Sequence, residues 1–350
     1  MAFIILKFDD LDENTLFDFK RALLLCQKYN ALSCFGLIGR SLEEPTAEYV
    51  DELHALLFEG VELWNHGFFH TEEEFSVGTY ESQRYSIGKT QKLMEKHLGK
   101  APTTFGSPHN NSTEVTISVI GDNFPEIKNL LFMADGEGRI NINQLVLRCN
   151  YEIKTGLVDI DYFKSEYNRI KQYPYFVMQG HPSFWRDDDF ERFEEILKIL
   201  SADGNEFITA HKLCDENVTK SLLVFDNKWI NSLSEFYSSH DKIFFYGAGE
   251  IGREVFKYSK YKGFVPDAFV VSDGHRQFSE LCGVPVYEFS EVKNIQESFG
   301  IIPTILGKSH EAVFNKPEFN ELDIWSAGTL VSYDEFIDYI RYSISIGQYE

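Results

Sequence analysis

The sequence predicts an α/β protein made of a strand-and-helix barrel followed by a smaller α/β domain. From Phe3 to about Thr209, short apolar runs alternate with stretches whose apolar residues recur at helical spacing. Roughly eight such runs occur, which suits a closed barrel better than an open sheet. The same alternation starts again at Lys242, after a mixed polar stretch. A length of 350 residues is also typical of two domains.

The strands of the barrel are predicted from apolar runs bounded by polar residues and turns. They are Phe3–Phe8, Ser33–Ile38, Val61–Trp64, Thr103–Phe105, Leu130–Met133, Leu145–Arg148, Tyr175–Met178 and Glu206–Ile208. Helices are expected between them, for instance over Leu16–Lys28, Ala47–Phe58 and Thr79–His97. In a barrel of this kind the chemistry takes place at the carboxyl ends of the strands.

The second domain has its own predicted strands and a closing helix. We expect the barrel domain to span residues 1–215, a linker residues 216–240 and the second domain residues 241–350, with an amphipathic helix in residues 331–350. The strands predicted in this domain are Lys242–Tyr246, Ala268–Ser272, Pro285–Phe289, Ile301–Leu306 and Asp323–Trp325.

The composition is that of a globular protein with an acidic surface. Hydrophobic residues make up 43% and charged residues 25% of the chain, and the formal net charge is −22. Such a surface repels phosphate backbones and anionic lipid head groups, which argues against nucleic acid and bare membranes as partners. A phosphorylated small molecule stays open, because a helix N-terminus binds phosphate without basic side chains.

Several features of the sequence predict a cytoplasmic protein. The apolar run at the N-terminus is stopped by Lys7 and then by Asp9 and Asp10, whereas a secretory signal needs a basic start and a longer apolar stretch. No run of about 18 apolar residues occurs, so no membrane span is expected. The five cysteines show no C-x-x-C spacing, as expected for reduced thiols.

Acidic residues and histidines follow three of the predicted strands. The first strand runs into Asp9 and Asp10, and the third runs into His66 and His70, which lie four residues apart. On one helical turn this spacing puts both imidazoles on the same side, as a shared metal ion requires. Asp10 completes an Asp/His/His set with an open position, which suits Zn, Co, Ni or Fe. Asp9 is not needed as a ligand and remains available as a base. His181, which follows the strand Tyr175–Met178, remains available as an acid.

Each of these residues also has an ordinary structural interpretation. An acidic pair after a strand usually caps a helix or lies in a solvated turn, and a histidine pair at this spacing is as often found on a surface as around a metal. His181, which precedes Pro182, has a structural role in most such settings. Their combination at strand ends of one barrel favours a site.

The order of these motifs resembles the polysaccharide deacetylases of the NodB-homology type, carbohydrate esterase family 4. That family has a strand ending in T-F-D-D, an H-[S/T]-x-x-H motif and a histidine after a late strand. Here the corresponding residues are Lys7-Phe8-Asp9-Asp10, His66-Gly67-Phe68-Phe69-His70 and His181, and the resemblance extends over residues 1–215. It implies a distorted (β/α) barrel.

The resemblance also implies a role for each residue. Asp10, His66 and His70 would bind a divalent metal, expected to be Zn, with Co, Ni or Fe as alternatives. Asp9 would be the general base, and His181 the general acid that protonates the leaving amine. A metal ion lowers the pKa of bound water from about 15.7 towards 7 and polarises an amide carbonyl.

The sequence departs from the family in its third and fourth motifs. The third motif of the family holds an arginine and a Pro-Tyr pair, whereas residues 104–111 hold Pro108 and His109 and no arginine. The backbone N–H of His109 can still serve an oxyanion, and its side chain is a substrate contact, an extra ligand or an ordinary loop residue. Asp135 is the nearest counterpart of the fourth motif. In the second motif, Gly67 stands where Ser or Thr is usual. From these departures together we expect a substrate unlike chitin or peptidoglycan.

A glycine-rich turn opens the second domain. Gly247, Gly249 and Gly252 form G-x-G-x-x-G between a strand and a helix, a context in which helix N–H groups bind phosphate. Asp273 ends the next strand, where a ribose hydroxyl is often bound. The domain resembles the small Rossmann-like nucleotide-binding domains attached to sugar-modifying enzymes of surface-polysaccharide synthesis. A nucleotide or nucleotide-sugar site and a purely structural module are equally compatible with the turn.

Together these features predict a metal-dependent carbohydrate deacetylase. It would remove an acetyl or formyl group from an amino sugar carried on a nucleotide or lipid, in O-antigen or capsule synthesis. Its partner would be this small-molecule sugar. The alternatives are a catalytically inactive sugar-binding protein of the same fold and, third, an oxidoreductase acting through the second domain.

Overall fold

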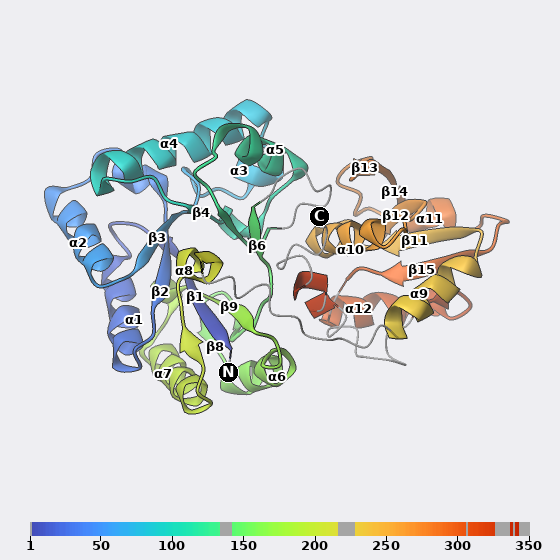
Figure 1. Ribbon diagram of the computed structural model, residues 1–350. Coiled ribbons are helices and arrows are strands. Elements are labelled where there is room, and N and C mark those ends of the chain that lie inside the picture. Colours follow the sequence, from blue (N-terminus) through green and yellow to red (C-terminus); the bar gives the residue numbers. More distant parts are fainter. Residues whose placement is uncertain are drawn as a thin grey trace. The chain divides into compact units, whose positions relative to one another are not determined.

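The chain divides into two compact units. The computed structural model describes residues 2–133, 142–215, 228–305, 307–325, 337–338 and 340–342. One unit is made of Met1–Met133 and Arg139–Leu222, and the other contains Leu223–Glu350. Figure 1 shows the barrel strands in blue to yellow-green and the second sheet in orange. In the described part of the chain, no helix is long and apolar enough to cross a membrane.

The first unit is built on an eight-stranded sheet whose pairs are all parallel. β1 lies between β2 on one side and β9 on the other, and the segment after β6 bridges to β9 through Arg148 and Val177. The sheet is therefore nearly closed, and the predicted barrel is confirmed. The strands are β1 (Phe3–Leu11), β2 (Ser33–Leu37), β3 (Glu62–Asn65), β4 (Thr104–Phe105), β5 (Asn129–Leu131), β6 (Asn143–Leu145), β9 (Tyr175–Gly180) and β10 (Glu206–Phe207).

Helices connect most of the consecutive barrel strands, as crossover connections between parallel strands usually do. Two of them begin at a threonine whose hydroxyl accepts a backbone N–H, Thr46 before α2 and Thr79 before α4, and α4 ends at Gly99 with φ +81°. The helices of this unit are α1 (Leu16–Lys28), α2 (Ala47–Phe58), α3 (Glu73–Ser76), α4 (Tyr80–Leu98), α5 (Glu114–Asn123), α6 (Ile160–Ile170), α7 (Asp187–Ala202) and α8 (Ala210–Asp215).

A short antiparallel hairpin interrupts the alternation after β6. It consists of β7 (Glu152–Lys154) and β8 (Leu157–Val158), joined by a turn at Thr155 and Gly156. The sequence does not predict these strands, because two or three residues are too few to show a period. The hairpin matters because it carries Glu152 to the candidate site.

Aromatic side chains fill the core beside β1. Phe8 is fully buried and makes edge contacts with Phe35, Trp185 and Phe193 at centroid distances of 5.6–5.9 Å. Phe19 of α1 adds to this cluster through Phe35. Edge-to-face pairs of this kind stabilise a fold beyond the area that they bury. The cluster fixes the strand that carries Asp9 and Asp10.

The second unit has a six-stranded sheet of order β13-β14-β12-β11-β15-β16. All its pairs are parallel except β13 with β14. β12 lies on one side of β11, whereas β15 and then β16 lie on the other. The connections that follow β11 and β15 therefore run in opposite directions along the sheet. Its strands are β11 (Lys242–Tyr246), β12 (Ala268–Val271), β13 (Glu280–Leu281), β14 (Val284–Glu288), β15 (Phe299–Pro303) and β16 (Asp323–Ile324).

The helices of the second unit are α9 (Lys228–Ser238), α10 (Glu250–Tyr261), α11 (Phe289–Val292) and α12 (Gly307–Phe314). α9 occupies residues that the sequence assigns to the linker, because that stretch combines serines with apolar residues at helical spacing. Most of the predicted helix in residues 331–350 lies outside the described residues, and only residues 337–338 and 340–342 are seen to be helical.

Candidate active site

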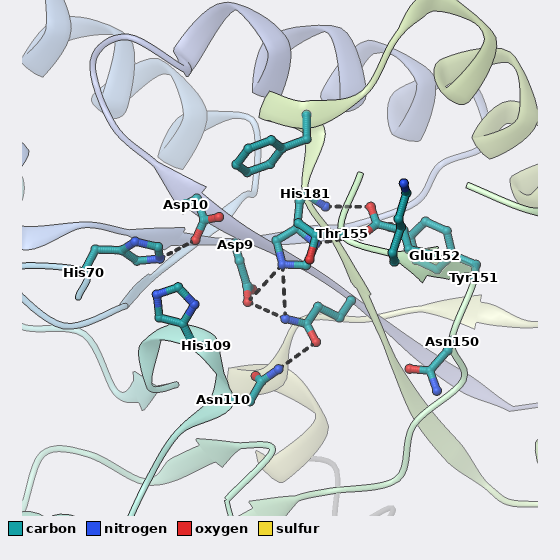
Figure 2. A pocket seen from close by; sticks show the side chains of 13 residues that line it. Asp9, Asp10, His70, His109, Asn110, Asn150, Tyr151, Glu152, Thr155 and His181 are labelled. Atoms are coloured by element: carbon teal, nitrogen blue, oxygen red, sulfur yellow. Dashed lines mark hydrogen bonds and ion pairs between the residues drawn. The ribbon is translucent and has the colours of Figure 1, made fainter. Parts of the chain in front are cut away.

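A cavity of about 420 Å³ lies where the barrel strands end. Figure 2 shows Asp9 and Asp10 at the end of β1, facing His181 after β9 and His109 after β4. The parallel arrangement explains why residues so far apart in the chain meet, since all the carboxyl ends point the same way. The lining residues are Asp9, Asp10, His70, His109, Asn110, Asn150, Tyr151, Glu152, Lys154, Thr155, Gln179, His181 and Phe184.

Asp10, His66 and His70 form a cluster able to hold a metal ion. Their ligand atoms all lie within 4.8 Å of one another. Asp10 Oδ1 is 2.7 Å from His70 Nε2 and 3.1 Å from His66 Nε2. One carboxylate with two imidazoles suits Zn, Co, Ni or Fe, and it leaves positions for water or substrate.

The orientation of His66 fits the role of a ligand. Its Nδ1 is 2.8 Å from the carbonyl oxygen of Gly106, and a carbonyl can only accept, so Nδ1 carries the proton. Nε2 is then the ring nitrogen that faces Asp10. A backbone carbonyl that fixes the tautomer in this way is typical of metal-binding histidines. The donor set therefore fits a divalent cation.

The electrostatics of the cluster follow from burial and hydrogen bonding. Burial by itself would raise the pKa of Asp10, but the hydrogen bonds from His66 and His70 hold it well below its usual value. For His70, burial works to lower the pKa, and the bond to Asp10 outweighs it, so the pKa is raised. Asp10 is thus an anion placed between two imidazoles.

The segment from His66 to His70 is a loop, so the predicted helical turn is wrong. His70 has a left-handed backbone with φ +58°, which ends any helical path. The loop is instead organised by Glu74, whose Oε1 accepts the N–H of Phe68 at 2.8 Å and whose Oε2 accepts that of His70 at 2.7 Å. The N–H of Phe69 also reaches Oε1, at 3.1 Å. A buried carboxylate thus satisfies three backbone donors that a helix would have paired.

Gly67 is required by the same loop. Its φ is +73°, and a Cβ there would approach Glu74, Phe75 and Pro108 to 3.0 Å each. The serine or threonine usual in the motif would be strained in this conformation. Sequence reasoning did not identify Glu74, because nothing distinguishes it from the neighbouring Glu72 and Glu73.

Asp9 is paired with a buried lysine. Lys7 Nζ lies 2.6 Å from Asp9 Oδ1 and 2.5 Å from Oδ2, and Gln179 Nε2 donates to Oδ2 at 2.6 Å. Burial lowers the pKa of Lys7, and the Asp9 carboxylate opposes that shift. Sequence reasoning missed Lys7, although its position two residues before Asp9 puts both side chains on one face of the strand.

His181 is paired with Glu152 of the hairpin. His181 Nδ1 lies 2.7 Å from Glu152 Oε2, and its backbone N–H donates to Oε1 at 2.9 Å. Trp185 Nε1 also donates to Oε1, at 2.6 Å. Burial works to lower the pKa of His181, but Glu152 and the charge of Asp9 raise it. His181 Nε2 is 4.0 Å from Asp9 Oδ2. Asp135, the nearest counterpart of the family's fourth motif in the sequence, lies outside the described residues.

His109 also lies at the cavity. It has φ +56° in the short turn Pro108–Asn110, and its ring centroid is 5.1 Å from that of His70. The next residue, Asn110, donates to Gln179 Oε1 at 3.1 Å. Left-handed backbone at both His70 and His109 is a strained feature of the kind that clusters at functional sites.

The glycine-rich turn of the second unit is shaped by close packing. Gly247 has φ +122°, and a Cβ there would lie 2.8 Å from the carbonyl oxygen of Thr304. A Cβ on Gly252 would lie 2.4 Å from the carbonyl oxygen of Gly247, whereas one on Gly249 would meet nothing within 4 Å. Asp273 Oδ1 accepts the N–H of Ser290 at the start of α11. Packing thus accounts for two of the three glycines.

Comparison with known proteins supports a deacetylase domain in the first unit. Residues 2–123 match the family model described as polysaccharide deacetylase, a stretch that includes Asp9, Asp10, His66 and His70. No curated protein matches the chain.

Several solved structures are similar to part of the chain. A family 4 acetyl xylan esterase from Clostridium thermocellum in complex with cobalt is 16% identical, with 62% of this chain and 92% of that one covered and a TM-score of 0.47. A peptidoglycan deacetylase from Bacillus subtilis is 18% identical, with 68% of this chain and 96% of that one covered and a TM-score of 0.44. A CE4 family pseudoenzyme from Bacillus anthracis is 15% identical, with 61% of this chain and 65% of that one covered and a TM-score of 0.46.

Proposed function

We propose that this protein is a metal-dependent deacylase that removes an acetyl or formyl group from an amino sugar. The observation that carries the proposal is the Asp10/His66/His70 cluster with Asp9 and His181 beside it in one cavity. When bound, a divalent cation supplies Lewis acidity, lowering the pKa of water towards 7 and polarising the amide carbonyl. Zinc is the metal that we expect, since a three-ligand site with imidazole and carboxylate donors is common for it.

The chain's own residues supply the proton transfers. Asp9 accepts a proton from the attacking water, and its ion pair with Lys7 orients the carboxylate. His181, held by Glu152, donates a proton from Nε2 to the leaving amine nitrogen as the C–N bond breaks. In this proposal the backbone N–H of His109 donates to the developing oxyanion. Acid–base assistance of this kind contributes roughly 10²–10⁴ in rate.

The setting that we propose is surface-polysaccharide synthesis in the cytoplasm, with the amino sugar carried on a nucleotide or lipid. O-antigen and capsule synthesis are the proposed contexts. Support comes from the combination of a deacetylase-type site with the glycine-rich turn between β11 and α10 in the second unit. The substrate is a small-molecule sugar, and the acidic surface argues against nucleic acid.

We further propose that the second unit is a Rossmann-like domain that binds a nucleotide or nucleotide-sugar through Gly247, Gly249, Gly252 and Asp273. The turn precedes α10, whose N-terminal N–H groups favour phosphate. Titration of the full chain with UDP, GDP and ADP tests this. Gly249→Asp adds a carboxylate where there is free space, so it should abolish binding, whereas Gly249→Ala should not. Equal affinity of the two variants would contradict a phosphate site at this turn.

Metal analysis of the purified protein tests the hydrolase. Wild type should hold about one divalent ion per chain, and His70→Ala should lose it, because that change removes one of three ligands. His54→Ala, which alters an exposed histidine of α2, is the matched control and should keep the metal. No metal in wild type after addition of Zn, Co and Ni would contradict the proposal.

The alternative function is a sugar-binding protein without catalysis. Its supporting observation is that the Asp9 oxygens already accept hydrogen bonds from both Lys7 and Gln179. Release of acetate or formate from acylated amino sugars by the metal-loaded wild type, lost in Asp9→Asn with metal retained, supports the hydrolase. Sugar binding without release in wild type supports the alternative.

A further inference from the structure

Lys7 is a fully buried lysine in the interior of the barrel. Its exposed fraction is 0% and that of its partner Asp9 is 2%. Both residues belong to β1, and residues i and i+2 of a strand point to the same face, here the inside of the barrel. An unpaired ammonium at such a position would carry a large desolvation cost, so Lys7 depends on Asp9.

The surroundings of Lys7 restrict where its ammonium can point. Nζ lies 5.2 Å from the centre of the Trp64 ring and 5.0 Å from that of Phe132. These cation–π contacts are made by fully buried rings, and they hold the charge without offering an alternative anion. The ammonium is therefore preorganised towards the carboxylate of Asp9.

The geometry of Asp9 depends on this contact. Lys7 contacts both carboxylate oxygens, and Gln179 contacts Oδ2. Three donor contacts on one carboxylate define its rotation about the side-chain bonds. The segment of residues 104–111 offers no arginine for this purpose, so the cation comes from the same strand as the base.

We propose that Lys7 is the positioning residue of the base, because its contacts with both carboxylate oxygens fix the orientation of Asp9 in the cavity. The inference rests on the proposed deacylase function. It is specific to this chain because the cation lies two residues before the base. A purely structural ion pair would behave differently, since a buried pair can often be replaced by apolar or neutral residues without loss of a remote activity.

A double-mutant cycle separates these roles. We would measure kcat, KM, metal content and thermal unfolding of the full, metal-loaded chain for wild type, Lys7→Met, Asp9→Asn and the double variant. Lys7→Met should lower kcat about 100-fold, at the lower bound of acid–base assistance, with metal retained and KM changed far less. In the Asp9→Asn background the same change should have no further effect on kcat, because Lys7 acts through Asp9.

Two further variants complete the test. Lys7→Arg keeps the charge and should recover part of kcat. Lys20→Met removes a lysine from an exposed pair with Glu52 and should leave kcat unchanged. If Lys7→Met fails to fold, the kcat of the double variant is compared with that of Asp9→Asn. The double variant lacks both charges of the pair, so it leaves no unpaired charge in the barrel.

The outcomes distinguish this inference from the function on which it rests. A wild type that binds metal and releases neither acetate nor formate overturns both. An active wild type whose kcat is within twofold in Lys7→Met overturns the role of Lys7 alone. The role of Lys7 is also overturned if Lys7→Met lowers kcat in the Asp9→Asn background by the same factor as in wild type.

Discussion

Glu152 accepts hydrogen bonds from both the side chain and the backbone of His181, at 2.7 Å from Nδ1 and 2.9 Å from the amide nitrogen. The two residues come from a hairpin and from the end of a barrel strand, 29 positions apart in the sequence. Because Nδ1 donates to Glu152, Nε2 is the nitrogen that faces the cavity. The pair therefore sets both the tautomer and the charge of the candidate acid.

The first prediction concerns the pH dependence of activity in Glu152→Gln. Burial lowers the pKa of His181, but Glu152 and Asp9 raise it above its ordinary 6.5. A raised pKa means that the proton is present below that value and lost as the pH rises through it. Removing the Glu152 charge should lower the pKa, so the alkaline limb of the kcat profile should move to lower pH.

The matched control is Glu191→Gln, which changes an exposed glutamate of α7. Its pH profile should superimpose on that of wild type. The stability of wild type should also gain from the His181 ion pair below pH 6.5, and this gain should disappear as the pH rises through the raised pKa. An alkaline limb that stays in place in Glu152→Gln would show that Glu152 does not tune the acid.

A second prediction concerns Glu74, which accepts the N–H groups of Phe68, Phe69 and His70. Glu74→Gln replaces one accepting oxygen by an NH₂ group, which faces backbone donors. We expect metal affinity to fall about 10–100-fold, as is usual when a group that orients ligands is lost. Metal titration of the apo-protein measures this. Glu73→Gln, an exposed neighbour, should bind as wild type does, and equal affinity of the two variants would refute the role of Glu74.

A third prediction compares two glycines with left-handed backbone. Gly99→Ala places a Cβ in free space at φ +81°, so it should cost only the backbone strain of about 1–2 kcal/mol. Gly67→Ala adds contacts of 3.0 Å to Glu74, Phe75 and Pro108, so the free energy of unfolding should fall further. It should also weaken metal binding, because the loop carries His66 and His70. Denaturant titration and metal analysis check both points, and equal losses in the two variants would exclude the packing contribution.

A fourth prediction concerns the aromatic core behind the site. Phe8→Ala removes a fully buried ring that contacts Phe35, Trp185 and Phe193, so the free energy of unfolding should fall by about 3–5 kcal/mol. Phe58→Ala removes a ring that is 94% exposed and should change stability by no more than about 0.5 kcal/mol. Denaturant unfolding of both variants measures the difference. Comparable stabilities would show that the Phe8 ring does not anchor β1.

Much of the barrel could be predicted from the sequence because its signals are local. The helices Leu16–Lys28 and Ala47–Phe58 have the predicted bounds, since apolar spacing and flanking polar residues specify them within a few residues of chain. The ends of the predicted strands were equally informative about the position of the candidate site. Parallel strands bring their carboxyl ends to one edge, so the sequence could indicate that Asp9, Asp10 and His181 would meet.

The contacts that tune these side chains were decided only by tertiary structure. Lys7, Glu74 and Glu152 are ordinary charged residues in the sequence, and each becomes a partner of the site because the fold buries it. The loop from His66 to His70 shows the same limit, since its spacing also fits a helix until Glu74 and the left-handed His70 are taken into account.

The sequence by itself therefore determined the alternation of strands and helices and the residue types that could bind a metal. Only the tertiary structure decided which charges face one another across the barrel. The physical reason is that periodicity and turn chemistry act over a few residues, whereas pairing of buried charges depends on desolvation, which is defined only once distant segments pack together.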